Sequence, residues 1–211
     1  MRRELSLVVV SLCLFPSRGV QQAPPGWLAV ADHAGLDSLV RHSGSFSGWV
    51  RGDQDTSVGT LRQSFQADSV RGHRLRFRAF VYTKLDEGTA GLWMRVDGPG
   101  VQEVLAFDNM NLRPITGYTP WRPYEVVLDV PAQSSVIAFG LLVEGRGQVW
   151  LDDVQLEVVR SAVPSTDMGG GLAQPQAETP LSSSPAEQER ILGARRRAPR
   201  WPVNLGFEQR P

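Results

Sequence analysis

The sequence predicts an all-β protein whose main domain is a β-sandwich. In residues 75–82, apolar side chains at the odd positions alternate with Arg76, Arg78, Phe80 and Tyr82 at the even positions. A repeat of two is the repeat of a β-strand, because successive side chains point to opposite faces of the sheet. Short runs of this kind recur between Gly- and Pro-rich turns, and no convincing helix separates them. That pattern favours a sandwich over a parallel sheet with helical crossovers.

The remaining predicted strands follow in chain order. They are residues 60–67, 90–97, 104–108, 124–130, 135–143 and 148–159. Turn-forming residues bound them at 86–88, 97–100, 130–131 and 144–147. Residues 116–123 are polar and contain proline, so we expect them to form an exposed loop.

Residues 1–19 have the pattern of a secretory signal peptide. Arg2 and Arg3 precede an apolar run at 5–15, which is too short to cross a hydrocarbon layer of roughly 30 Å. The alternative is a buried N-terminal strand, because residues 7–10 are β-prone. The first interpretation predicts a secreted or periplasmic protein with no transmembrane segment in the mature chain.

Composition limits the classes of function. The chain has 211 residues, 41% of them hydrophobic, which is enough for one well-packed domain. Its 22 basic and 22 acidic residues balance, so no overall charge draws it to nucleic acid, and we expect no nucleic-acid partner. The single cysteine, Cys13, lies in the predicted signal peptide. A mature chain without it has no disulfide, no thiol nucleophile and no cysteine metal ligand.

The sandwich is predicted to span about residues 24–160. Residues 161–200 then become rich in Ser, Pro, Gly, Ala and Gln, which predicts a disordered linker with room for a short helical turn at 186–197. Residues 201–211 are apolar again, and their position at the end of a linker requires an explanation.

Several segments of the middle zone carry a resemblance to known proteins. They are residues 91–98, 107–110, 113–117, 121, 124–131, 139–142 and 149–154. They resemble a module of bacterial exported and regulatory proteins that has no assigned activity. More broadly, they resemble the galactose-binding-like jelly roll of cellulase- and xylanase-type carbohydrate-binding modules. The resemblance covers about residues 24–159 and implies a jelly-roll sandwich, with carbohydrate as the expected ligand class.

One departure from that family concerns its opening strand. Such modules begin with an Asn-x-x-Phe-Glu strand, which is missing before Trp27 and is found instead at 204–208. Two interpretations follow. The C-terminal strand docks back and completes the sandwich, as in a circular permutation, or it begins a second module that this chain does not complete.

Candidate ligand-binding residues are aromatic and polar side chains. Sugar-binding jelly rolls stack sugar rings on exposed aromatic rings, with polar groups beside them. The candidates are Tyr82, Trp93, Tyr118 and Trp121, with Asp108, Asn109 and Arg113 as polar partners. Core or rim packing is the alternative for the tryptophans, and a structural turn at 108–109 accounts equally well for the polar residues.

A stripe of basic residues and two acidic residues suggest further sites. Arg74, Arg76 and Arg78 could meet an anionic sugar or phosphate, or form the solvated face of a half-buried sheet. The family resemblance also implies a structural Ca²⁺, with Asp153 and Glu208 as the matching ligands. No other cofactor is expected.

No catalytic arrangement stands out. Neighbouring carboxylates such as Asp152 and Asp153 point to opposite faces of one strand, so they cannot act on one bond together. We therefore predict an exported binding module that is not an enzyme, most simply one for a glycan. The alternatives are a structural or protein-interaction adaptor of the cell envelope that docks a partner protein, and a secreted hydrolase.

Overall fold

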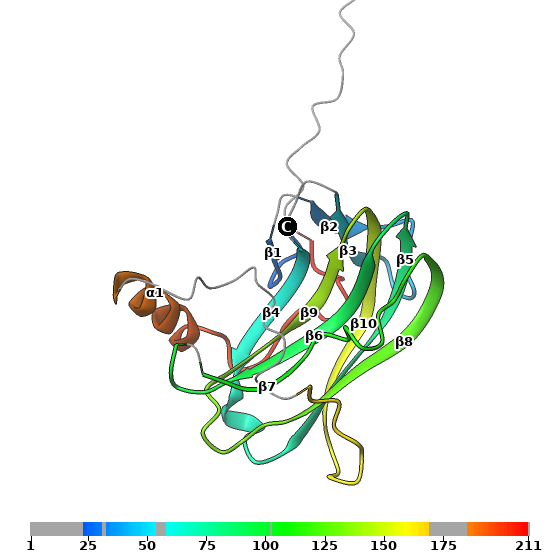
Figure 1. The fold of residues 1–211 in the computed structure, drawn as a ribbon. Helices are drawn as coiled ribbons and strands as arrows, with labels where there is room; N and C mark the ends of the chain where they lie inside the picture. The colour runs from blue at the N-terminus through cyan, green and yellow to red at the C-terminus, as the bar shows by residue number, and fades with distance from the viewer. Residues whose placement is uncertain (1–22, 31–32, 54–57, 102, 169–184, 211) are drawn as a thin grey trace, which may run out of the picture.

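The computed structural model describes residues 23–30, 33–53, 58–101, 103–168 and 185–210. These residues form two five-stranded antiparallel sheets, as the sequence predicts. Sheet A has the order β1 (Leu28–Val30), β4 (Gly59–Gln66), β9 (Val136–Glu144), β6 (Thr89–Asp97) and β7 (Val104–Asp108). Sheet B has the order β2 (Ala34–Asp37), β3 (Ser47–Gly52), β10 (Gly147–Val159), β5 (Arg74–Leu85) and β8 (Tyr118–Asp129). Figure 1 shows the two sheets facing each other as the layers of a sandwich.

The core lies between the sheets and follows the alternation seen in the sequence. Leu75, Phe77, Ala79 and Val81 of β5 are all fully buried. Phe139 of β9 lies at their centre and packs edge-on against Phe77 with ring centroids 5.1 Å apart. The even positions of β5 therefore lie on the outer face of sheet B.

Strand β8 begins earlier than the sequence predicts. Residues 118–123, expected as a loop, extend this strand, although it contains Pro120 and Pro123. Proline lacks an N–H to donate, so it is tolerated only where no neighbour needs that donor. Strand β8 is the edge of sheet B, next to β5 alone, which satisfies this condition. Strands β1, β2 and β3 were also not predicted, because they are short or rich in glycine.

The C-terminal residues pack into the sandwich, but they form a turn and not the predicted edge strand. Asn204 and Phe207 have positive φ angles of 52° and 60°, which a strand does not allow. Phe207 is fully buried and stacks on Trp27 with ring centroids 4.9 Å apart. The Trp27 indole N–H donates to the carbonyl of Asn204, and the Val154 N–H donates to that of Leu205. In Figure 1 this segment runs from α1 (Pro185–Arg196) to the end of the sandwich near β1 and β2.

The described parts of the predicted linker also contact the sandwich. The Thr166 N–H donates to the carbonyl of Val127 in β8, and the Met168 N–H donates to that of Phe107 in β7. The predicted helical turn is present as α1. The predicted signal peptide lies outside the described residues, as does the middle of the linker. Within the described part of the chain, no helix has the length and apolar character needed to cross a membrane.

Candidate functional site

The outer face of sheet B carries a cluster of aromatic side chains at one end. We call this cluster the aromatic end; its members are Trp49, Phe80, Tyr82, Tyr118, Trp121 and Trp150. Strand register places Trp49, Trp150 and Tyr82 directly opposite one another on β3, β10 and β5. Directly opposite residues share a face, so these three rings form a row across the strands.

Four members of the aromatic end remain open to solvent. Tyr118 is 68% exposed, and Phe80, Tyr82 and Trp121 are partly exposed, whereas Trp49 and Trp150 are buried. The ring centroid of Tyr82 lies 5.6 Å from that of Tyr118 and 5.6 Å from that of Trp121. The Tyr82 and Tyr118 hydroxyls hydrogen-bond at 3.2 Å, and this bond is the main reason that the pKa of Tyr118 is raised. A register shift between β5 and β8 beside Tyr82 places Trp121 next to it.

Asp37 fixes the buried Trp150 under this surface. The Trp150 indole N–H donates to Asp37 Oδ2 at 2.9 Å, and the backbone N–H groups of Leu39 and Val40 donate to Oδ1. Burial by itself raises the pKa of Asp37, but these hydrogen bonds and the nearby Lys84 charge together lower it. Asp37 is therefore ionised at neutral pH and holds Trp150 in place.

A histidine from the loop at 41–45 adds a further ring. His42 stacks on Phe80 with ring centroids 3.7 Å apart and meets Trp121 edge-on at 5.8 Å. Its Nδ1 lies 2.6 Å from Asp153 Oδ2. Because the carboxylate fixes Nδ1, the Nε2 atom is the one left for a ligand.

Three acidic side chains hold that loop in place. Asp152 accepts the backbone N–H groups of His42 and Ser43, and Glu208 accepts that of Ser45. Asp153 accepts the Ser43 hydroxyl as well as the histidine. Asp152 is fully buried, and its burial raises its pKa. A β-bulge after Asp152, where Asp153 has a φ of 49°, brings both carboxylates to the loop.

These contacts bear on the predicted Ca²⁺ site. The carboxylates of Asp153 and Glu208 already accept hydrogen bonds from donors of the loop. Within the described residues, no three His, Cys, Asp or Glu side chains converge as a metal site would require. The Ca²⁺ site that the resemblance implied at Asp153 and Glu208 therefore stays a prediction.

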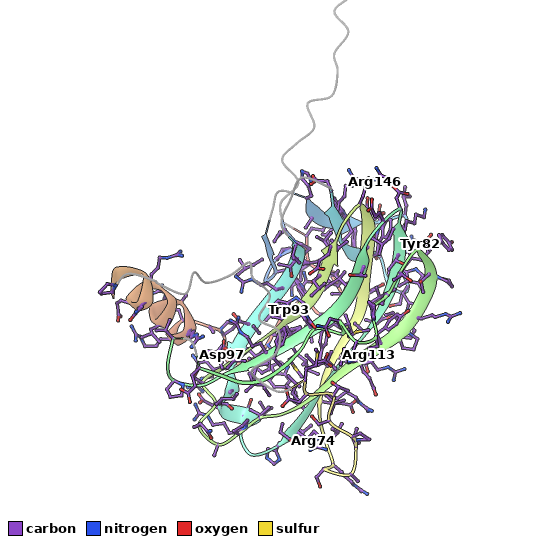
Figure 2. All side chains as sticks on the ribbon, in the orientation of Figure 1. Arg74, Tyr82, Trp93, Asp97, Arg113 and Arg146 are labelled. Atoms are coloured by element: carbon purple, nitrogen blue, oxygen red, sulfur yellow. The ribbon has the colours of Figure 1, made fainter. Side chains whose placement is uncertain are left out.

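The structure brings together only part of the predicted ligand-binding set. Tyr82, Tyr118 and Trp121 meet at the aromatic end. Trp93 lies on sheet A, is 4% exposed and donates its indole N–H to Thr60 Oγ1, so it packs against its own sheet. Figure 2 shows Trp93 well apart from Tyr82.

The predicted polar partners form a structural turn after β7. Asp108 is fully buried, accepts the Met110 N–H and forms an ion pair with Arg113 at 2.5 Å. Asn109 accepts the N–H of Asn111 through its side chain. The structural turn considered from the sequence accounts for all three residues.

Phe80 and His42 were not among the predicted site residues. Phe80 had a visible signal, since it alternates with Tyr82 on the outward face of a predicted strand. His42 had none, because its place depends on Asp153, far away in the sequence.

Sequence comparisons find one curated relative of this chain but no family. No family model matches the chain. It is 44% identical over 151 residues to a Bacillus subtilis (strain 168) protein named as the uncharacterized HTH-type transcriptional regulator YbfP. That alignment takes in 68% of this chain and 51% of the relative, so the chain spans about half the length of this curated relative.

Two solved structures share the sandwich. One is the CBM22-1 xylan-binding domain of Paenibacillus barcinonensis Xyn10C, with a TM-score of 0.51, 16% identity, and coverage of 67% of this chain and 91% of that one. The other is the CBM22-1–CBM22-2 tandem of the same protein, with a TM-score of 0.50, 16% identity, and coverage of 67% and 43%. The chain therefore has the jelly-roll β-sandwich of carbohydrate-binding modules, as the sequence resemblance indicated. At this identity the likeness establishes the fold.

Proposed function

We propose that the protein is a non-catalytic carbohydrate-binding module and that its aromatic end is the binding surface. The observation that carries the proposal is the group formed by Tyr82, Tyr118 and Trp121. Two solvent-accessible rings that each pack against Tyr82 give, together with it, an apolar surface for a sugar to stack on. The two hydroxyls and the Nε2 atom of His42 supply hydrogen-bonding groups at its border.

Two observations support a binding role over a catalytic one. The adjacent carboxylates Asp152 and Asp153 are engaged by the loop at 41–45, and so is Glu208. An acid that accepts several fixed donors is a poor candidate to exchange a proton with substrate. The jelly-roll fold, shared with a xylan-binding domain, makes a glycan the first ligand class to test.

The cellular setting is part of the proposal. The apolar run at 5–15 favours export and glycan binding outside the cytoplasm. The relative named as a transcriptional regulator supports a second candidate function, in which the sandwich is the ligand-sensing part of a regulatory protein. Both candidates use the same binding surface. N-terminal sequencing of the protein from its native host separates them, because export requires a cleaved N-terminus near residue 19.

The test is a glycan array probed with the purified protein and with Tyr118→Ala/Trp121→Ala. The control variant is Trp201→Ala, which removes another exposed tryptophan, one that packs against Phe65 and lies outside the aromatic end. We expect the wild type and the control to bind the same glycans and the double variant to lose the signal. Absence of glycan binding by folded wild-type protein would overturn the proposal.

A further inference from the structure

A second row of side chains runs beside the aromatic row on sheet B. Register places Arg51, Gln148, Lys84 and Tyr118 opposite one another across β3, β10, β5 and β8. This row lies on the same outer face as the row of Trp49, Trp150 and Tyr82. Arg51, Gln148 and Lys84 each lie two residues from one of those three rings, and Tyr118 pairs with Lys84. Arg51, Lys84 and Tyr118 are all exposed.

The two cations of this row lie over aromatic rings. The Nζ atom of Lys84 is 5.6 Å from the ring centroid of Tyr82 and 5.8 Å from that of Trp150. The guanidinium carbon of Arg51 is 5.6 Å from the ring centroid of Trp49. Rings support a cation at this distance without neutralising its charge.

Neither cation has a carboxylate partner among the described residues. Arg51 donates to the neutral amide of Gln148 at 2.8 Å, and Lys84 makes no ion pair in that part of the chain. The acid that Lys84 influences is Asp37, whose oxygens accept the Trp150, Leu39 and Val40 donors. At the opposite end of β5, by contrast, Arg74 and Arg76 pair with acids on the neighbouring strands.

We propose that the glycan bound here is acidic and carries carboxylates, as a uronic acid chain does. This inference rests on the proposed sugar-binding function. A sugar ring stacked on Tyr82 and Tyr118 brings its carboxylate within reach of Lys84, which donates to it. Arg51, two strands away and so about 10 Å along the row, serves a neighbouring sugar unit. A charge-assisted hydrogen bond at a partly covered site is stronger than a neutral one, so these cations select acidic sugars over neutral ones.

The test compares oligogalacturonate with xylohexaose by calorimetric titration at about 50 mM salt. The variants are Lys84→Gln, which keeps the side-chain length, and Arg76→Gln, which removes a paired cation from the same face of the same strand. We expect the wild type to bind oligogalacturonate at least tenfold more tightly than xylohexaose. Lys84→Gln should reduce the affinity for oligogalacturonate about tenfold and change that for xylohexaose less than twofold, whereas Arg76→Gln should leave both unchanged. Added salt should weaken binding of the acidic probe alone.

The outcomes separate the two proposals. Equal affinity for both sugars, with no effect of Lys84→Gln, overturns the acidic ligand and leaves sugar binding in place. Binding of neither sugar overturns the acidic ligand, and the glycan array then decides the sugar-binding proposal by itself. Polyglutamate is the control for charge without sugar, and its binding as tightly as oligogalacturonate would also overturn the inference.

Discussion

The two ends of the outer face of sheet B have opposite chemistry, although β5, β8 and β10 run through both. At one end, Arg74 pairs with Asp129, and Arg76 pairs with Glu125 and Glu157. We call this the ion-paired end. At the other end lies the aromatic end with Lys84 and His42. Figure 2 places Arg74 and Tyr82 at these two ends of the sheet.

The residues on the neighbouring strands decide the difference. Arg74 and Arg76 face carboxylates, so their charges and donors are already engaged. Lys84 faces Gln148 and Tyr118, which are neutral. Two of the three arginines of the stripe that the sequence offered as an anion site, Arg74 and Arg76, are thus ion-paired. Lys84 lies farther along the same strand, and no ion pair of it is found among the described residues.

The largest expected effect comes from removing the buried side chain that anchors the C-terminal turn in the core. Phe207 fills the space beside Trp27 and Gly48, and Glu208 next to it holds Ser45 in the loop of His42. Because Phe207 is fully buried, Phe207→Ala should lower the free energy of unfolding by about 3–5 kcal/mol. Chemical denaturation measures this change.

The control is Val203→Ala, which alters an exposed residue of the same segment and should change the free energy of unfolding by about 0.5 kcal/mol or less. A loss below about 1 kcal/mol for Phe207→Ala would mean that the C-terminal turn does not support the sandwich.

A smaller effect is expected from His42, which adds a polar group to the aromatic end. His42→Ala removes the ring stacked on Phe80, and we expect ligand affinity to fall about tenfold, which corresponds to about 1.4 kcal/mol. Calorimetric titration with the best glycan from the array measures it. His33→Ala is the matched control, since His33 is exposed and lies 3.8 Å from Asp53. Equal ligand affinities of the two variants would show that His42 does not contribute to binding.

The third prediction uses the pH dependence of stability. The pKa of Asp37 is lower in the folded protein than in the unfolded chain, where it is about 3.9. Its ionised form therefore stabilises the fold above that pH, and this stabilisation is lost as the pH falls through the pKa of the folded state. Asp37→Asn should therefore flatten the loss of stability below about pH 4, by less than about 1 kcal/mol because the group is largely solvated. Chemical denaturation at about six pH values between pH 2 and pH 7 measures the free energy of unfolding of both proteins. The same loss of stability below about pH 4 in the variant and the wild type would contradict the anchoring role of Asp37.

The smallest effect is expected at the ion-paired end. Arg76→Gln breaks two partly exposed ion pairs, and such pairs contribute only about 0.2–1 kcal/mol each. A double-mutant cycle with Glu157→Gln measures the coupling. A coupling energy above about 2 kcal/mol would show that the ion-paired end is a major source of stability and would contradict this prediction.

The sequence was sufficient to predict the sandwich because alternation is a local signal. Leu75 to Val81 show it clearly, and each of these inward residues is buried. It was not sufficient for residues 118–123, because whether prolines are tolerated depends on β8 being an edge strand, which is a property of the whole sheet.

The candidate site could likewise be predicted only where the signal lies in the nearby sequence. Tyr82, Tyr118 and Trp121 were chosen for their ring type and polar surroundings, and the structure brings them together. Trp93 is also a tryptophan, but residues of other strands bury its ring and accept its hydrogen bond, as Thr60 does. The position of His42 depends on a bulge in β10, which no pattern near residue 42 reveals.

The most direct test of the binding surface is an NMR titration of the labelled protein with the glycan that binds best. The backbone amide signals of residues 80–84 and 118–123 and that of His42 should shift on binding, while those of 74–78 and 125–129 stay in place. Shifts confined to the ion-paired end or to sheet A would contradict the assignment of the aromatic end as the binding surface.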